Sequence, residues 1–143
     1  MRIAGDSGRS VLGHPEVRVG YPVTVATFPL CVVGAPVQVT SIRLLQPRGL
    51  RLVDWGWQPS FAAMQAAPEG MAAKAGYKKE PINVTCGEKY GATVGITVER
   101  TDSSAGTARA YTISYAGGSL TVPFGTALCL KKCTDRDMRA AGD

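Results

Sequence analysis

The sequence predicts an all-β protein: an immunoglobulin-like sandwich of two antiparallel sheets, with about seven strands and two disulfides. Runs of alternating apolar and polar residues recur along the chain, and turn-forming residues separate them about every 8 to 12 residues. The 143 residues include 17 Gly and 9 Pro, which favour short strands over long helices. Four cysteines stand at the ends of extended segments, as in small domains that disulfides stabilise.

The length of the chain is enough for one core and too short for two ordinary domains. Residues 1–16 contain several glycines and little periodicity, which predicts a flexible N-terminal linker. A single immunoglobulin-like domain is expected over residues 17–133. Residues 134–143 are expected to form a C-terminal tail, as a short helix or a frayed end.

Three strands are expected in the first half of the domain. Residues 17–30 alternate between apolar and polar, and their two prolines indicate an edge strand or two short strands with a break. In the second strand, over 37–45, the apolar positions change parity near Thr40, which predicts a β-bulge. The third strand, over 50–57, is partly apolar on both faces, so we expect it at the centre of a sheet.

Residues 58–81 differ from the rest of the chain because they are rich in Ala and Met and are interrupted by Pro and Gly. These interruptions limit any helix to one or two turns and predict a long loop. Because long loops within compact domains are often functional, we expect partner contacts here. The candidate binding surface consists of Phe61, Met64, Met71 and Tyr77.

The second half of the domain is expected to be strand throughout. The first three segments cover residues 82–86, 92–100 and 108–115. Gly117 and Gly118 then join the third segment to a strand over 120–130, which predicts a hairpin with a primed turn.

Aromatic side chains at alternate strand positions could form a platform for a carbohydrate or a peptide. Aromatics in strands more often fill a core, so we predict that they pack in the interior. The residues concerned are Trp55, Trp57, Tyr111 and Tyr115.

Four cysteines allow three disulfide pairings. Cys31 and Cys129 each end a long strand, and the first and last strands of a sandwich often run side by side. We therefore predict a Cys31–Cys129 bridge, which leaves Cys86 to pair with Cys133. A direct bridge between Cys129 and Cys133 remains the alternative.

The sequence indicates no metal, cofactor or catalytic site. Structural zinc sites use closely paired cysteines, and Cys31 and Cys86 each stand alone. The segment Gly5-Asp6-Ser7-Gly8 resembles the nucleophile motif of serine hydrolases, but the sole histidine, His14, follows Ser7 by only seven residues. We expect a non-enzymatic protein, with a serine hydrolase using this motif and a metal-handling domain as alternatives.

The net charge of +5 is too scattered to indicate a nucleic-acid binder. No apolar run approaches the length of a transmembrane helix, so any membrane attachment is expected through an anchor outside this sequence. The denser basic group near the C-terminus consists of Lys131, Lys132, Arg136 and Arg139.

Several segments of the chain resemble uncharacterised exported or membrane-anchored proteins of actinobacteria. They are Phe28-Pro29-Leu30-Cys31, Leu50-Arg51-Leu52-Val53-Asp54-Trp55, Val84-Thr85-Cys86, and Tyr115-Ala116-Gly117-Gly118 leading into Val122-Pro123-Phe124 and Leu128-Cys129. The resemblance implies an immunoglobulin-like sandwich outside the cytoplasmic membrane. We therefore expect an extracytoplasmic structural or binding module, the ectodomain of a secreted or membrane-anchored bacterial protein, which contacts a protein or a cell-envelope component.

Overall fold

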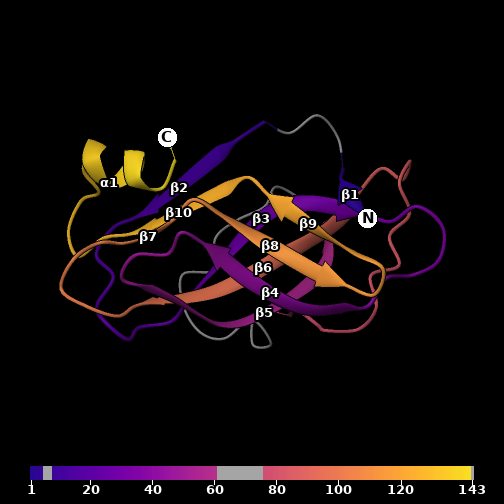
Figure 1. Cartoon of the computed structure of the whole chain (residues 1–143), viewed down its shortest axis with the longest axis horizontal. Helices are drawn as coiled ribbons and strands as arrows, with labels where there is room; N and C mark the ends of the chain where they lie inside the picture. The colour runs from indigo at the N-terminus through magenta and orange to yellow at the C-terminus, as the bar shows by residue number, and fades with distance from the viewer. Residues whose placement is uncertain (5–7, 61–75, 143) are drawn as a thin grey trace.

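The computed structural model describes residues 1–4, 8–60 and 76–142 of the chain. Within these ranges it contains strands in three hydrogen-bonded sheets and one short helix (Figure 1). The elements are β1 (Arg2–Ile3), β2 (Ser10–His14), β3 (Val23–Cys31), β4 (Val39–Leu45), β5 (Leu50–Ser60), β6 (Gly91–Arg100), β7 (Gly106–Ala108), β8 (Ala110–Tyr115), β9 (Gly118–Val122), β10 (Phe124–Leu128) and α1 (Asp135–Ala140). The predicted all-β class is confirmed.

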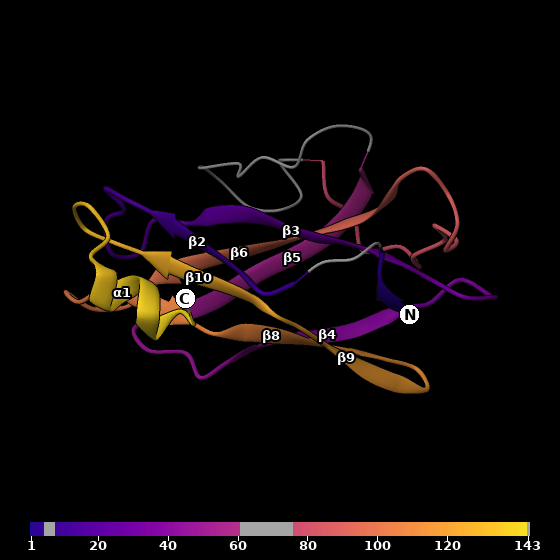
Figure 2. The same ribbon diagram turned by 90° about the horizontal axis from the view of Figure 1, so that it is seen from above.

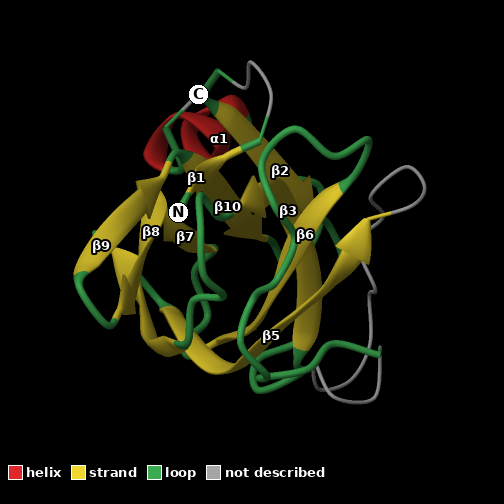
Figure 3. Ribbon diagram, turned by 90° about the vertical axis from the view of Figure 1, so that its right-hand side faces the viewer, coloured by secondary structure: helices red, strands yellow, loops and turns green. Residues whose placement is uncertain are grey.

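The strands form two layers, seen edge-on in Figure 2. One layer is the four-stranded sheet with the order β1-β3-β6-β5. The other contains two three-stranded sheets, with the orders β2-β10-β7 and β4-β8-β9. Short breaks at Arg109 and Pro123 separate β7 from β8 and β9 from β10. In Figure 3 the strands enclose the interior, and α1 lies near β2 and β10.

The core lies between these layers and includes most of β6 and half of β8. Ile96 and Ile113 are fully or almost fully buried, as is Tyr111. The Tyr111 hydroxyl is hydrogen-bonded to the Thr27 hydroxyl. Burial raises the pKa of the Tyr111 phenol above its ordinary value, and this hydrogen bond opposes part of the rise.

Two details of strand register follow the sequence. The β4–β8 pairing shifts between Val39 and Ser41, which confirms the predicted bulge. The β8–β9 hairpin is confirmed as well, since Tyr115 pairs with Gly118. The prediction of a primed turn is wrong. The two central residues of the turn are Ala116 and Gly117, and a primed turn requires a positive φ at the first of them. Only Gly117 has a positive φ.

The position of β5 in its sheet corrects the predicted central strand. β5 lies at one edge, and the buried central strand next to it is β6. The prediction depended on the apolar residues on both faces of β5. Residues 77–82 cover part of the outer edge of this strand, where Trp57 and Lys78 form a β-bridge, so β5 is shielded although it lies at the edge.

The N-terminal segment, expected as a linker, contains the short strands β1 and β2 among its described residues. Arg2 and Ile3 pair with the end of β3, and residues 10–14 run parallel to β10. These short strands lack an apolar periodicity because hydrogen bonds to existing sheet edges hold them. At the other end of the chain, Thr134 and Asp137 form a capping box that begins α1.

The disulfides join Cys31 to Cys86 and Cys129 to Cys133, which corrects the predicted pairing. The backbone explains the first bridge, because Val32 exchanges hydrogen bonds with Val84 and Cys86 and so holds the two segments together. Cys129 follows β10, whose neighbours are β2 and β7 rather than β3. Two bridges indicate a non-reducing, extracytoplasmic environment.

Candidate functional site

Most of the predicted binding surface lies outside the described residues, namely Phe61, Met64 and Met71. Gly5, Asp6 and Ser7 of the hydrolase motif also lie outside them. Tyr77, the fourth residue of the candidate binding surface, is described and is only 7% exposed, so it offers little surface to a partner. Burial raises the pKa of its phenol, and a hydrogen bond with Gln58 partly opposes this.

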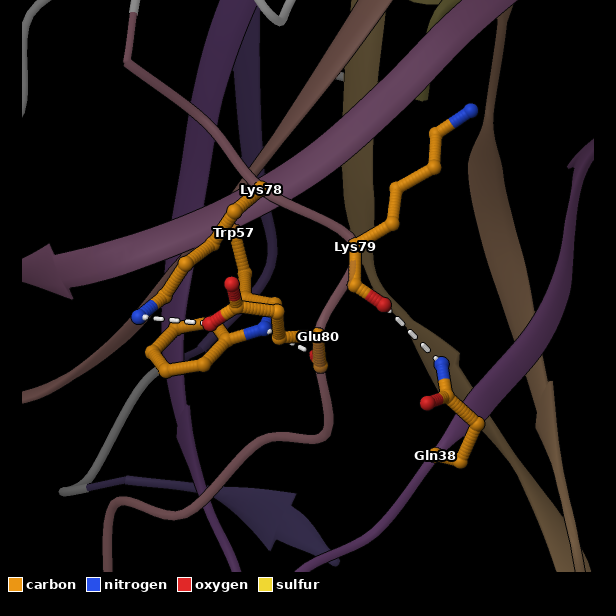
Figure 4. A network of polar contacts seen from close by, with 5 residues as sticks. All are labelled: Gln38, Trp57, Lys78, Lys79 and Glu80. Carbon is orange, nitrogen blue, oxygen red and sulfur yellow. Dashed lines mark hydrogen bonds and ion pairs between the residues drawn. The ribbon is translucent and has the colours of Figure 1, made fainter.

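The segment that contains Tyr77 is bound tightly against β5 (Figure 4). The Trp57 indole N–H donates to the carbonyl oxygen of Glu80 at 2.6 Å, and the Lys78 ammonium lies 4.6 Å from the centroid of the Trp57 ring. The Gln38 amide donates to the carbonyl oxygen of Lys79 at 3.0 Å. These contacts make residues 77–82 a structural cover for the edge of β5.

The aromatic residues of β5 and β8 pack as the sequence predicts. Trp57 is 2% exposed and Tyr111 is fully buried. Trp55 and Tyr115 are half-buried and pack against the core. An exposed aromatic platform is therefore not the site.

Gly95 on β6 provides a test of how closely Tyr77 packs. A Cβ atom at Gly95 would lie 2.6 Å from two ring carbons of Tyr77. We expect Gly95→Ala to displace the ring and to lower the free energy of unfolding by about 1 to 3 kcal/mol, measured by urea denaturation. Gly8→Ala is the control, since among the described residues no atom beyond its chain neighbours lies within 4 Å of the added Cβ. An equal loss in the two variants would contradict the close packing.

The most distinctive polar surface is a groove between the β4–β5 turn, the β7–β8 junction and α1. One hollow of about 460 Å³ is lined by Gln46, Pro47, Arg48, Arg109 and Ala140. A second hollow of about 470 Å³ shares Arg48 and Ala140 with the first and adds Asp102, Arg136 and Asp137 among its walls. We call this surface the arginine groove, after Arg48, Arg109 and Arg136.

Backbone hydrogen bonds fix two of these arginines in place. Arg48 and Thr107 exchange N–H to carbonyl bonds of 2.8 Å in each direction, which attaches the β4–β5 turn to β7. The Arg109 N–H donates to the carbonyl oxygen of Leu45 at 3.1 Å. Both residues are exposed, so their side chains extend from a rigid frame toward solvent.

The third side of the groove depends on Arg9. Its guanidinium donates to the carbonyl oxygens of Gly142 at 2.7 Å, Ala141 at 3.1 Å and Arg109 at 2.5 Å. These bonds hold the C-terminal end of α1 against the β7–β8 junction. Arg136, on α1, therefore lies in the same groove as Arg48.

Among the described residues, the groove contains three arginines and two aspartates. Within the described residues, the ion pairs join Arg51 to Glu99, Lys78 to Glu80 and Lys79 to Asp54, and none involves a groove arginine.

The two acidic groups of the second hollow already accept backbone hydrogen bonds. Asp102 accepts from the N–H of Ser104, and Asp137 accepts from the N–H of Thr134, each at 2.9 Å. Among the residues that the structure describes, the lining of the first hollow contains two arginines and no acidic residue. Guanidinium groups match the geometry of phosphate and carboxylate, so this hollow is suited to an anionic group.

Sequence reasoning found only one part of this groove. Arg136 belongs to the dense basic group near the C-terminus, whereas Arg48 and Arg109 are isolated in the sequence. The pairing of the β4–β5 turn with β7 brings Arg48 close to Arg109.

Within the part of the chain that the structure describes, no three or more His, Cys, Asp or Glu residues form a group that could hold a metal ion. The described helix is too short to cross a membrane.

Comparison of the chain with family models, with curated proteins and with solved structures finds no significant match in any of the three.

Proposed function

We propose that the chain is a non-enzymatic, extracytoplasmic module of immunoglobulin-like fold, and that its arginine groove binds an anionic group of a cell-envelope component. The module would belong to a secreted or membrane-anchored protein. The observation that carries the proposal is the first hollow, where the exposed Arg48 and Arg109 share a wall whose other described residues are all uncharged.

The strand orders support the immunoglobulin-like part of the proposal. The order β1-β3-β6-β5 corresponds to the A-B-E-D sheet of that fold. In the other layer, β7 and β8 together correspond to strand F if the break at Arg109 is disregarded. With the break at Pro123 disregarded, β9 and β10 together correspond to strand G, and β4 corresponds to strand C. Strand A would then divide into β1 and β2.

Two features differ from antibody-type domains of this fold. The buried Trp57 lies on β5 instead of strand C, and the Cys31–Cys86 bridge does not join strands B and F. The topological likeness therefore concerns the fold only, and the proposed activity depends on the groove.

The frame of the groove supports binding by a preformed site. The backbone bonds at Arg48 and Arg109, and those from Arg9 to the end of α1, join groups of the protein itself. A preformed site loses less conformational entropy on binding. The two hollows share Arg48, so a chain with successive anionic groups could occupy both.

Binding of a labelled short-chain polyphosphate, followed by fluorescence anisotropy, tests the proposal. We expect Arg48→Gln and Arg109→Gln each to weaken binding by about three- to tenfold, because each removes a charged hydrogen-bond donor at an exposed site. Added salt should weaken binding by the wild-type protein.

Arg43→Gln is the matched control, because Arg43 is an exposed arginine on β4 that lines neither hollow. Its affinity should match that of the wild-type protein. An equal loss with Arg43→Gln would show that only total charge matters, and an absence of binding by the wild-type protein would also reject the proposed function.

A further inference from the structure

An exposed aliphatic residue distinguishes the loop that follows β10. Within the described residues, the large hydrophobic residues that are exposed are Val19, Val33, Tyr90 and Leu130. Leu130 is 53% exposed and Val19 is 52% exposed. They lie on two loops that hydrogen bonds join, because Val17 donates to the carbonyl oxygen of Cys129 and Glu16 donates to that of Lys131. We call residues 16–19 and 129–132 the loop tip.

The charge around the loop tip is mainly positive. Lys131 and Lys132 follow Leu130 directly, and Arg18 precedes Val19; all three basic residues are exposed. The one acidic residue of the tip is Glu16, which is exposed as well. None of the three basic residues takes part in the ion pairs found among the described residues.

The Cys129–Cys133 disulfide holds this arrangement in place. It closes a loop that contains only Leu130, Lys131 and Lys132, and Cys129 is itself buried. A hollow of about 300 Å³ lies beside the bridge, with Cys133 and Met138 in its wall. The aliphatic residue and the two lysines are therefore presented together without ordering a flexible loop on binding.

We infer that the loop tip rests on an anionic lipid surface, with Leu130 in the interfacial region of the bilayer and Lys131 and Lys132 among the headgroups. Aliphatic insertion and electrostatic attraction are each weak alone, and peripheral membrane binding combines them. The centres of protein interfaces are instead rich in aromatic residues and poor in lysine. The residue types at the tip therefore favour lipid over a protein partner.

The loop tip and the arginine groove are separate surfaces at the same end of the molecule. This end carries α1, the last loop and the C-terminus, and it lies opposite β1 (Figure 1). Neither hollow of the groove includes a residue of the tip. The two proposals can therefore succeed or fail independently.

Co-sedimentation with vesicles tests the inference. One set of vesicles contains equal amounts of phosphatidylglycerol and phosphatidylcholine, and the other contains phosphatidylcholine alone. We expect the wild-type protein to bind the first set, with weaker binding in high salt, and to bind the second set negligibly. Leu130→Ser should weaken binding about tenfold. Lys131→Ala combined with Lys132→Ala should weaken it about 25-fold, at about fivefold for each lysine.

Val33→Ser is the matched control, since Val33 is 71% exposed and lies just after β3, away from the loop tip. It should bind like the wild-type protein. A direct readout of insertion comes from Leu130→Trp, whose added tryptophan fluorescence should shift to shorter wavelength with the anionic vesicles, while that of Val33→Trp should not. Circular dichroism confirms that each variant folds.

Several results would overturn the inference. They are equal binding to the two kinds of vesicle, unchanged binding by Leu130→Ser, an equal loss with Val33→Ser, or no spectral shift with Leu130→Trp. If Arg109→Gln abolished vesicle binding and Leu130→Ser did not, lipid would be held by the groove instead of the tip. Polyphosphate binding should be unchanged in Leu130→Ser, which keeps this test separate from that of the proposed function.

Discussion

Replacing Cys31 and Cys86 with alanine is expected to lower the free energy of unfolding by about 4 kcal/mol. This bridge joins residues separated by 55 positions and so restricts a large part of the unfolded chain. The Cys129–Cys133 bridge has a separation of 4 and closes a far smaller loop. The same double replacement there should cost about 2 kcal/mol, because the entropy removed from the unfolded chain increases with loop length.

Urea denaturation without reductant measures this difference, and the single variant Cys31→Ala tests the pairing itself. Its one free thiol should lie on Cys86, found by alkylation and peptide mapping. A label on Cys129 would support the pairing first predicted from the sequence and contradict the structure. Equal losses of stability in the two double variants would contradict the loop-length argument.

Arg100→Met is expected to lower the free energy of unfolding by about 3 to 5 kcal/mol. Arg100 is only 1% exposed, and its guanidinium donates hydrogen bonds to backbone carbonyl oxygens. The shortest, to Val17, measures 2.5 Å, and the others go to Asp102, Ser103 and Ser104. Methionine retains much of the buried stem but leaves these carbonyls without their donor.

Arg51→Met is the control for this variant. Arg51 lies on β5 and pairs with Glu99, the residue before Arg100 on β6, but the Arg51 side chain is 65% exposed. An exposed pair contributes about 0 to 1 kcal/mol. Urea denaturation of the two variants gives the comparison. Similar losses in the two variants would show that the carbonyl contacts of Arg100 contribute little to stability.

The local features that the sequence predicts are those that depend on neighbouring residues. The parity change near Thr40 indicates the bulge, and Gly117 indicates the hairpin. The wrong predictions concern strands whose position depends on a segment far away in the sequence. The pairing of β10 with β2 makes a strand of residues 10–14, and the cover formed by residues 77–82 places apolar residues at the edge strand β5.

The arginine groove shows the same limit. Arg48 and Arg109 are 61 positions apart in the sequence, counted as 109 minus 48, and no local pattern links them. The hydrogen bonds of Arg48 to Thr107 and of Arg109 to Leu45 bring them to one hollow. Arg9 lies in the segment that was expected to be a linker. Its guanidinium joins the end of α1 to the same surface.

The all-β class and most strand positions can be predicted from the sequence, because alternation and turn residues act over a few neighbouring positions. The pairing of the cysteines, the strand at the sheet edge and the arginines that share a groove are visible only in the folded chain. These outcomes depend on which backbone hydrogen bonds form between segments far apart in the chain, and a local pattern does not specify its distant partner.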